Sequence, residues 1–433
     1  MARSFEPLFA YLPQTGAQKA YSEGQAYTEH FDHAPAQNHS DHDNGNDRLV
    51  IWDELPEKSA TKKLIHRFFD TIARPYNILD REHFWRQYEA MCSNPRAVKV
   101  CFVIEVLMVV GLANATFPAE DQPLGGKRTA NWLALASSVP ATAMDLRDFD
   151  VETIRLWALI NLYRQTLRVD DVADYVYTAS TLHAGIVVGL NHPDTWSQGL
   201  KRYQLWEALV ELNLQASLSA GLPPSLSLGD ASLAPLGDEA ETSPSPVLSN
   251  ADLTDVLRRS RSIRHRIITL LNSEIRLRYE TIAKLDLELT ETMGTSVGSG
   301  PTVSGKGLIF YFSVVSACYS RTLAALHRPF SHTNAPALHY SRRLSAALAT
   351  NHLQSLDRIH SAGSGEAFAR LMSERGGTYI AGVFNSLLVV CSELYRRAPS
   401  HVNISHLDIS GHEEGLMLGI VEQYLQHANS SSH

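Results

Sequence analysis

The sequence predicts an all-α fold, in which a large multi-helix domain follows an N-terminal tail. Apolar residues recur at three- and four-residue steps in segment after segment, which is the spacing of one helix face. No segment shows the sustained alternation of apolar and polar residues that marks a strand. Of the 433 residues, 44% are hydrophobic and 19% are charged, a composition that suits a globular chain with a large core. The helical domain is predicted at residues 59–427.

Residues 1–47 form a polar tail that we expect to be disordered. They are rich in Gln, Asn, Ser, Asp, Gly and His, and so polar a segment cannot bury enough apolar surface to offset the entropy of ordering. Four histidines of this tail invite interpretation as a metal site: His30, His33, His39 and His42. Because no cysteine or helical frame sets their spacing, we favour a polar tail and predict no metal site.

Periodicity and helix-ending residues divide the domain into helices. Besides two helices discussed below, they are predicted at residues 59–72, 81–91, 96–113, 130–137, 151–167, 308–326, 339–360, 378–397 and 413–427. Asp150 is an expected N-cap, and Pro75 is expected to end the first helix because the residue before proline avoids helical geometry. Residues 252–289 are predicted as one long helix or two in sequence, and two segments are predicted as loops, 230–250 and 294–307.

The helix predicted at residues 200–220 is expected to lie at the centre of the domain. Its apolar residues spread over a wide surface, which implies packing on several sides. Asn213 lies inside this surface, and a buried amide without partners costs roughly 1–3 kcal/mol, so we expect it to hydrogen-bond to a neighbouring helix. Gly221 can adopt the left-handed conformation that ends a helix, and Pro223 cannot continue one.

Several residues of this helix and of the turn after it resemble a known family signature. The residues that fit in order and without a gap are Arg202, Leu205, Trp206, Ser217, Gly221 and Pro223. This string is similar to the middle homology region of fungal binuclear-zinc-cluster transcription factors, also called the fungal-specific transcription factor domain. Glu207 stands where the family has a second Trp, and Asn213 and Leu214 stand where it has an Asp-Arg pair. The packing pattern is therefore kept, while the residues of any salt bridge that the family makes here are changed.

Three further segments agree with this resemblance, which covers roughly residues 64–330 and continues to about residue 426. They are the helix at 173–194 with Gly185, Gly189 and Leu190, the segment PYNILDREHF at 75–84, and LHRPF at 326–330. The resemblance implies a nuclear protein that controls a set of genes, often those of a metabolic or secondary-metabolite pathway. It also implies that the helical domain restrains or relays activation, with binding of a small-molecule effector as one way to do so.

A member of the resembled family reads DNA through a module in which six cysteines hold two zinc ions. The cysteines of this chain are far apart and form no Cys-x-x-Cys pair: Cys92, Cys101, Cys318 and Cys391. We therefore expect the chain to lack a DNA-binding module of its own, and the net charge of −8 agrees with this expectation. A protein partner would then supply DNA binding, unless a zinc cluster is encoded upstream of Met1.

One concentrated basic segment lies between residues 258 and 266. Its arginines are Arg258, Arg259, Arg261, Arg264 and Arg266. Such a cluster is typical of a nuclear localisation signal or a nucleic-acid patch. Because Ile263 and Ile267 interleave with the arginines as a core stripe, we favour a solvated helix face that pairs with nearby acidic residues. Direct DNA contact is not expected from this chain alone.

The sequence contains no motif from which we predict an enzyme. His-Glu-x-x-His and dinucleotide fingerprints are absent, and we predict no catalytic residue and no cofactor. His183, His327 and Cys318 could be assembled into a triad on paper, but we interpret each as a core or groove residue. The alternative hypothesis is that the same helical domain has been recruited as a ligand-binding or catalytic protein in a biosynthetic pathway.

The longest apolar run does not predict a membrane segment. It covers residues 98–115, contains Lys99 and Glu105, and is shorter than the roughly 20 apolar residues that a spanning helix needs. The scattered cysteines suit buried thiols in a reducing compartment. These two observations predict a soluble intracellular protein without membrane contact. The resemblance implies that it is nuclear, with the cytoplasm as the other option.

Overall fold

Helices dominate the part of the chain that the computed structural model describes, and that part contains no strand. The described residues are 55–94, 98–117, 124, 132–133, 136, 150–167, 171–192, 200–227, 256–274, 277–294, 306–331, 336–361, 371 and 377–397. The predicted all-α fold class is confirmed. Several predicted segments lie outside the described residues: the tail at 1–47, the loop at 230–250, the helix at 413–427, and most of the segments at 130–137 and 294–307.

The helices described between residues 58 and 220 follow the predicted order, with the short helix α5 as an unpredicted addition. They are α4 (Lys58–Asp70), α5 (Ala73–Tyr76), α6 (Arg81–Ser93), α7 (Val100–Asn114), α9 (Val151–Leu167), α10 (Asp171–Val187) and α12 (Leu200–Ala220). The predicted N-cap of α9 is confirmed, because Asp150 Oδ1 accepts a hydrogen bond from the backbone N–H of Thr153 at 2.7 Å. Asp80 caps α6 in the same way, with 2.6 Å to the backbone nitrogen of His83.

The end of the first helix differs from the prediction. Helix α4 ends at Asp70, well before Pro75, because Thr71 leaves helical geometry with φ −125° and ψ −90°. Pro75 lies inside the short helix α5, whose first-turn N–H groups have no partner within the helix, so the missing N–H of proline costs no hydrogen bond there. Asn77 ends α5 in the left-handed region at φ 51°, which asparagine tolerates better than most residues.

In the second half of the chain, a segment predicted as one or two helices is divided into shorter ones. The described elements after α12 are α14 (Val256–Arg259), α15 (Arg261–Leu271), α16 (Tyr279–Leu289), the single turns η4 (Thr290–Gly294) and η5 (Pro336–Leu338), α18 (Lys306–Ser331), α19 (His339–Ser361) and α21 (Gly377–Arg397). The described residues of the segment at 252–289 thus form three helices, α14, α15 and α16, where one or two were predicted. Helix α15 ends where the side chains of Asn272 and Ser273 each donate to a backbone carbonyl at 2.8 Å, which competes with helix continuation.

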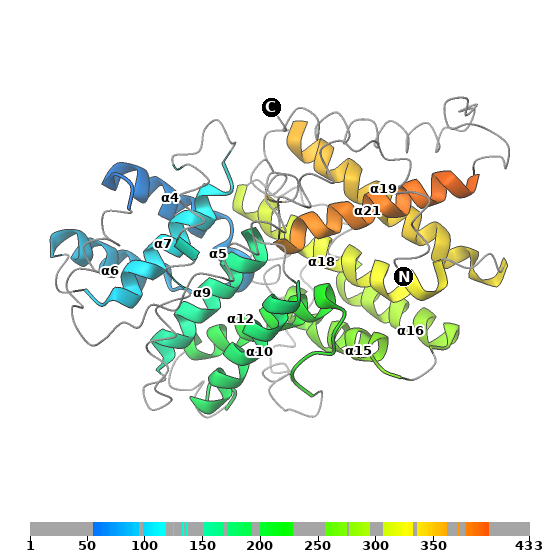
Figure 1. The fold of residues 1–433 in the computed structure, drawn as a ribbon, viewed down its shortest axis with the longest axis horizontal. Coiled ribbons are helices and arrows are strands. Elements are labelled where there is room, and N and C mark those ends of the chain that lie inside the picture. The colour runs from blue at the N-terminus through cyan, green and yellow to red at the C-terminus, as the bar shows by residue number, and fades with distance from the viewer. Residues whose placement is uncertain are drawn as a thin grey trace, which may run out of the picture. The chain divides into compact units, whose positions relative to one another are not determined.

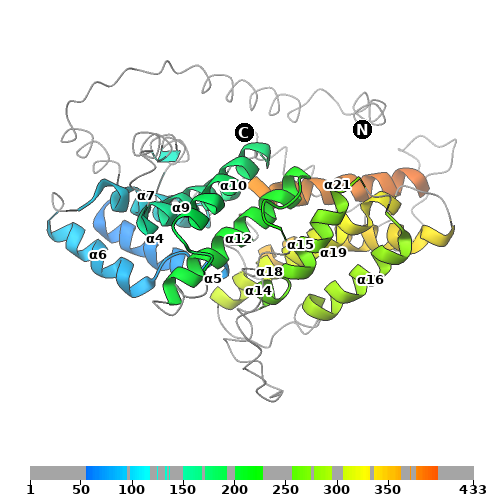
Figure 2. The ribbon, with the colours of Figure 1, turned by 90° about the horizontal axis from the view of Figure 1, so that it is seen from below.

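Helix α12 occupies the centre of the arrangement, as its wide apolar surface predicts. It packs against α5, α9, α10, α15 and α18. Figures 1 and 2 show it between an N-terminal group, in which α4, α7, α9 and α10 pack in succession, and a C-terminal group that includes α15, α16, α18 and α19. All contacts and sites described below lie within Arg48–Val389, which is one of the two compact units of the chain.

Helix α7 forms the most deeply buried part of the N-terminal group. Every residue from Phe102 to Asn114 is buried, so the helix has no solvated face. Glu105 is the one charged side chain within it, and it is 2% exposed. Although α7 is strongly apolar, none of the helices in the described ranges combines the length and the apolar character needed to cross a bilayer.

We expect Gly111→Ala to destabilise the protein. A Cβ atom at Gly111 would lie 2.6 Å from Cε2 of Tyr163 on α9, whose side chain is 2% exposed, so the ring or the helices would have to shift. Overpacking of this kind costs typically about 1–3 kcal/mol, more than the roughly 1 kcal/mol gained in helix propensity. The matched control is Gly382→Ala on α21, where the nearest atom would lie at 3.4 Å. Urea unfolding followed by circular dichroism should show a lower midpoint for the first variant only; equal midpoints would contradict the close approach.

Candidate functional site

Three of the residues that resemble the family signature, Leu205, Trp206 and Ser217, are buried, and Trp206 lies at the contact between α10 and α12. Trp206 is fully buried and Leu205 is 2% exposed. A Cβ atom at Gly185 of α10 would lie 2.8 Å from Cδ1 of Leu209 and 3.7 Å from Cζ3 of Trp206. The small residue at position 185 therefore lets the two helices approach closely. Arg202, at the start of α12, donates from NH2 to the carbonyl of Val188 at 3.0 Å.

Asn213 makes the contacts that its place in the apolar stripe predicts. Its Nδ2 lies 3.4 Å from Oγ1 of Thr178 on α10 and donates to Oγ of Ser225 at 3.0 Å, and its Oδ1 accepts from the Ser225 backbone N–H at 3.1 Å. The amide thus connects α12 both to a neighbouring helix and to the turn that follows. That turn begins at Gly221, whose φ of +64° is left-handed as expected, and the exposed Pro223 follows it.

Two arginines of the basic segment turn inward and pair with glutamates of α12. Arg264 donates from NH1 and NH2 to the two carboxylate oxygens of Glu211, at 2.8 Å and 2.7 Å, and both side chains are 2% exposed. Arg261 NH1 lies 2.6 Å from Oε2 of Glu207. Glu207 and Arg264 therefore belong to one buried charged cluster at the contact between α12 and α15.

The other arginines of the segment lie elsewhere. Arg266 pairs with Glu288 of α16 at the surface, where both side chains are more than two-fifths exposed. Arg258 NH1 is 3.5 Å from the hydroxyl of Tyr203, and Arg259 is exposed. The segment is thus divided between the interior and the solvent, an arrangement that neither interpretation of the sequence anticipated.

The electrostatics of the cluster favour the ionised form of Glu211. Burial alone would raise the pKa of this carboxyl, but the charge and hydrogen bonds of Arg264, together with Arg261, hold its pKa below the ordinary value. Gln215 also donates to Glu211 at 2.8 Å. On the other side, Arg264 NH1 lies 3.2 Å from Sγ of Cys318, and burial raises the pKa of that thiol. All three nitrogens of the Arg264 guanidinium therefore have a hydrogen-bond partner, since Nε donates to Ser260.

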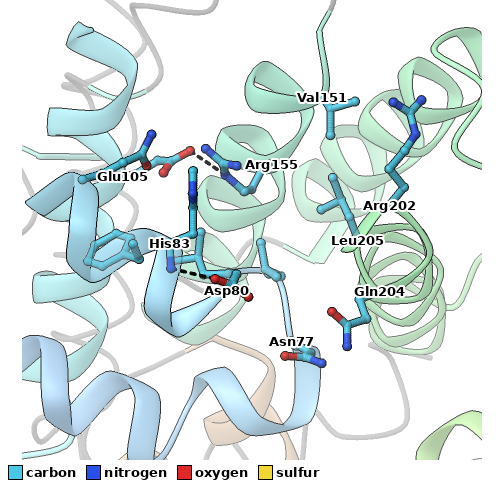
Figure 3. Close-up of a pocket in the computed structure, with 13 residues that line it drawn as sticks. Asn77, Asp80, His83, Glu105, Val151, Arg155, Arg202, Gln204 and Leu205 are labelled. Carbon is cyan, nitrogen blue, oxygen red and sulfur yellow. Dashed lines mark hydrogen bonds and ion pairs between the residues drawn. The ribbon is translucent and has the colours of Figure 1, made fainter. Parts of the chain in front are cut away.

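A polar pocket lies at the other end of α12 and is the candidate ligand site (Figure 3). It has a volume of about 150 Å³ and is enclosed by the turn after α5, by α6, α7 and α9, and by the start of α12. Its polar lining residues are Asn77, Asp80, His83, Gln87, Glu105, Arg155, Arg202 and Gln204. Sequence reasoning noted Glu105 only as a charge in an apolar run, although a lone carboxylate in such a helix was the available signal for a site.

Glu105 is a buried carboxyl group in the lining of this pocket. Its Oε1 accepts from Nε of Arg155 at 3.0 Å, while Oε2 is buried without a hydrogen-bond partner among the described residues. Burial raises the pKa of Glu105 to about 7, although the nearby Arg155 guanidinium lowers it. The carboxyl therefore changes its protonation state near neutral pH.

Parts of this chain are similar in sequence to known proteins. Transcription factor opdR of Penicillium oxalicum is 24% identical over 310 residues, which cover 65% of this chain and 39% of that protein. Transcription factor lepE of Aspergillus flavus is 23% identical over 64% of this chain and 36% of its own length, and the acetamidase regulatory protein of Emericella nidulans is 27% identical over 44% of this chain. The chain is similar to fungal transcription factors.

The extent of this similarity is limited in two respects. No protein-family model matches the chain. The chain spans between 36% and 39% of the length of the first two relatives, so most of each relative lies outside the matched region.

One buried row of side chains has the residue types of a Ser-His-Asp catalytic triad. Oγ of Ser341 lies 2.8 Å from Nδ1 of His327, whose Nε2 lies 3.3 Å from Oδ2 of Asp286. Burial alone would raise the pKa of Asp286, but hydrogen bonds from His327 and Tyr340 lower it. Ser341 and His327 are both 0% exposed, so no substrate reaches the hydroxyl. The Ser341–His327 hydrogen bond and the His327–Asp286 contact connect α16, α18 and α19, and we interpret the row as structural.

Other candidate catalytic or metal-binding residues are not brought together. Ring Nδ1 of His183 lies 2.7 Å from the carbonyl of Ala179 within α10, and Cys318 faces Arg264. The string GTSVG at 294–298 has Gly-x-Ser-x-Gly spacing, but helix α16 and turn η4 precede it where a nucleophile elbow requires a strand. Within the described ranges no three His, Cys, Asp or Glu side chains are grouped to hold a metal ion. The histidines of the predicted tail lie outside those ranges.

We expect Glu211→Gln to cost about 3–5 kcal/mol of unfolding free energy, because it leaves the buried Arg264 without its counter-charge. The control is Glu288→Gln, which breaks an exposed pair and should cost about 1 kcal/mol or less. Urea unfolding measures both. The double variant Glu211→Leu with Arg264→Met should recover much of the loss, since apolar side chains carry no desolvation cost. Equal losses for Glu211→Gln and Glu288→Gln would show that the cluster is not buried as described.

The raised pKa of Glu105 predicts a pH-dependent stability difference between wild type and Glu105→Gln. Because the folded state holds the proton more tightly, this carboxyl contributes most below its ordinary pKa of 4.5, and the contribution is lost as pH rises to about 7. Wild type should therefore lose roughly 3 kcal/mol relative to the variant between pH 4.5 and pH 8. Unfolding at several pH values tests this, with Glu280→Gln on α16 as the control for removing one carboxylate. A difference that is constant with pH would contradict it.

Proposed function

We propose that this chain is the regulatory part of a fungal transcriptional regulator. The observation that carries the proposal is the alignment of about two-thirds of the chain, 64–65%, with two proteins named transcription factors. The segment that resembles the family signature also lies at the centre of the helical structure, where a change in packing reaches both groups of helices. The names of these relatives do not favour the alternative of a catalytic protein in a biosynthetic pathway.

The finer proposal concerns what the chain regulates and how it reaches DNA. We infer a nuclear protein that controls a pathway-specific gene set, such as one for a metabolic or secondary-metabolite pathway. DNA reading is supplied by residues outside this chain, in a partner protein or in a zinc cluster beyond the sequence at hand. Supporting this, the net charge is −8, and Arg261 and Arg264 are occupied by buried glutamates rather than available to phosphates.

Regulation through such a domain requires two arrangements of the same helices. A ligand or partner shifts the balance between them only by its difference in affinity for the two. Helix α12 suits this role because it contacts helices of both groups. The regulatory unit is proposed to extend over residues 59–427, and the signature residues would act through packing rather than through chemistry.

The proposed function is tested by chromatin immunoprecipitation of the tagged full-length protein combined with transcript profiling of a deletion strain. We expect occupancy at the promoters of a limited gene set, loss of that occupancy when a co-purifying zinc-cluster protein is deleted, and at least a twofold change in the same transcripts. If the protein carries its own upstream cluster, occupancy should survive deletion of the partner and be lost on removal of that cluster. No occupancy together with unchanged transcripts would contradict the proposal.

A further inference from the structure

The outer face of α10 exposes apolar side chains that the other described helices leave uncovered. Among the described residues eight large apolar side chains are exposed, and four of them belong to this one helix: Val172, Val176, Tyr177 and Val187, at 61%, 53%, 49% and 76%. Helix α10 packs against α9 and α12 with its opposite side, and Figure 2 shows it at the edge of the N-terminal group. Contiguous exposed apolar patches mark interaction surfaces.

Most of these residues belong to one stripe along the helix. The α10 stripe consists of Val172, Val176, Ser180, His183 and Val187, and all five are exposed. Their steps of four, four, three and four residues keep them on one side of a helix. The stripe extends over most of the 17 residues of α10, a length of about 26 Å.

The α10 stripe contains no acidic residue, lysine or arginine. The one such residue between positions 172 and 190 is Asp174, which is buried and pairs with an arginine of α9 at 3.1 Å. The hydroxyl of Ser180 donates to the backbone carbonyl four residues earlier at 2.9 Å. Nδ1 of His183 lies 2.7 Å from the carbonyl four residues before it, and a carbonyl only accepts, so Nδ1 carries the proton. Both donors are thus used within the helix, which lowers the cost of covering the stripe.

We propose that the α10 stripe packs antiparallel against the α10 stripe of a second copy of this chain. A two-fold dimer brings the same patch of both subunits together, so the patch has to be complementary to itself. The α10 stripe meets this condition because its steps are nearly symmetric about residues 179 and 180. In the antiparallel pair Val172 lies opposite Val187 of the second copy, and Val176 lies opposite its His183.

The size of the stripe indicates a weak dimer. The largest apolar patch of a typical monomer measures about 300–600 Å². Two such faces together bury up to about 1,200 Å², which is the lower limit of a standard interface. The small side chains of Ala179 and Ser180 at the centre let the two helix axes approach to within about 8–10 Å. We therefore expect a Kd in the micromolar range, about 1–100 µM.

The direct test is sedimentation velocity of the purified full-length protein from about 1 to 200 µM. We expect a monomer–dimer equilibrium that does not weaken between about 50 and 500 mM NaCl, because salt screens the repulsion between two chains of charge −8 and leaves apolar contacts intact. Val176→Glu should raise the Kd at least tenfold, since each copy places a carboxylate in the contact. The matched control is Leu287→Glu at an exposed apolar position of α16, which should leave the Kd unchanged.

Cysteine substitutions and a short bis-maleimide crosslinker test the antiparallel arrangement. Ser180→Cys should give crosslinked dimer at least fivefold above wild type, which controls for the native cysteines. Val172→Cys and Val187→Cys should each give no more than wild type alone, because like positions lie about 22 Å apart in the antiparallel pair. A mixture of these two variants should crosslink.

Several outcomes would overturn the proposal. A monomer over the whole concentration range would do so, and a lower unfolding midpoint of Val176→Glu would then show that another segment of this chain covers the stripe. An equal Kd for wild type and Val176→Glu would place the dimer contact elsewhere. Crosslinking of Val172→Cys with itself would show a parallel pair. The dimer does not rest on the proposed function, so a dimer without promoter occupancy would support the interface and count against that function alone.

Discussion

The buried pair between Glu211 and Arg264 is the interaction on which the arrangement of the two helix groups depends. It joins residues 53 positions apart, one on the central helix and one on the first long helix of the C-terminal group. Removing two charges from water is expensive, and only good geometry with satisfied donors offsets the cost. Here both carboxylate oxygens of Glu211 accept a hydrogen bond from Arg264, at 2.8 Å and 2.7 Å. Gln215 also donates to Glu211, and Cys318 lies beside Arg264. We interpret the pair as setting the register of α15 on α12.

Polar residues specify the neighbours of α12 because its apolar residues cannot. A helix with a wide apolar surface can pack favourably in more than one rotation. Glu207 and Glu211 face α15, Asn213 faces α10 through Thr178, and Gln215 reaches the hydroxyl of Tyr76 on α5 at 3.2 Å. Each contact would be lost if the helix rotated about its axis, leaving an unsatisfied buried group. Glu207 and Glu211 supply the charges that pair α12 with α15.

The sequence predicts features that depend on neighbouring residues and misses features that depend on contacts between distant segments. Helix bounds such as 151–167 depend on local periodicity and on the cap at Asp150, so they are visible in the chain order. The pairing of Arg264 with Glu211 depends on how α15 packs against α12, and a local sequence pattern does not predict that packing. Thr71 ends α4 through its backbone geometry, a feature less conspicuous in sequence than Pro75. The pocket around Glu105 combines residues from 77 to 205, and in the sequence only the single carboxylate within an apolar run indicated it.

The positions of the pocket and the charged cluster on one helix set a limit on what a ligand can do. A ligand present at 100 times its Kd stabilises the arrangement that binds it by about 2.7 kcal/mol. That is comparable with, but smaller than, the roughly 3–5 kcal/mol expected for breaking the Glu211–Arg264 pair. Binding at the start of α12 therefore has too little free energy to break the cluster outright. A regulatory change driven from the pocket would instead have to keep the cluster intact and move α12 together with α15 against α7 and α9.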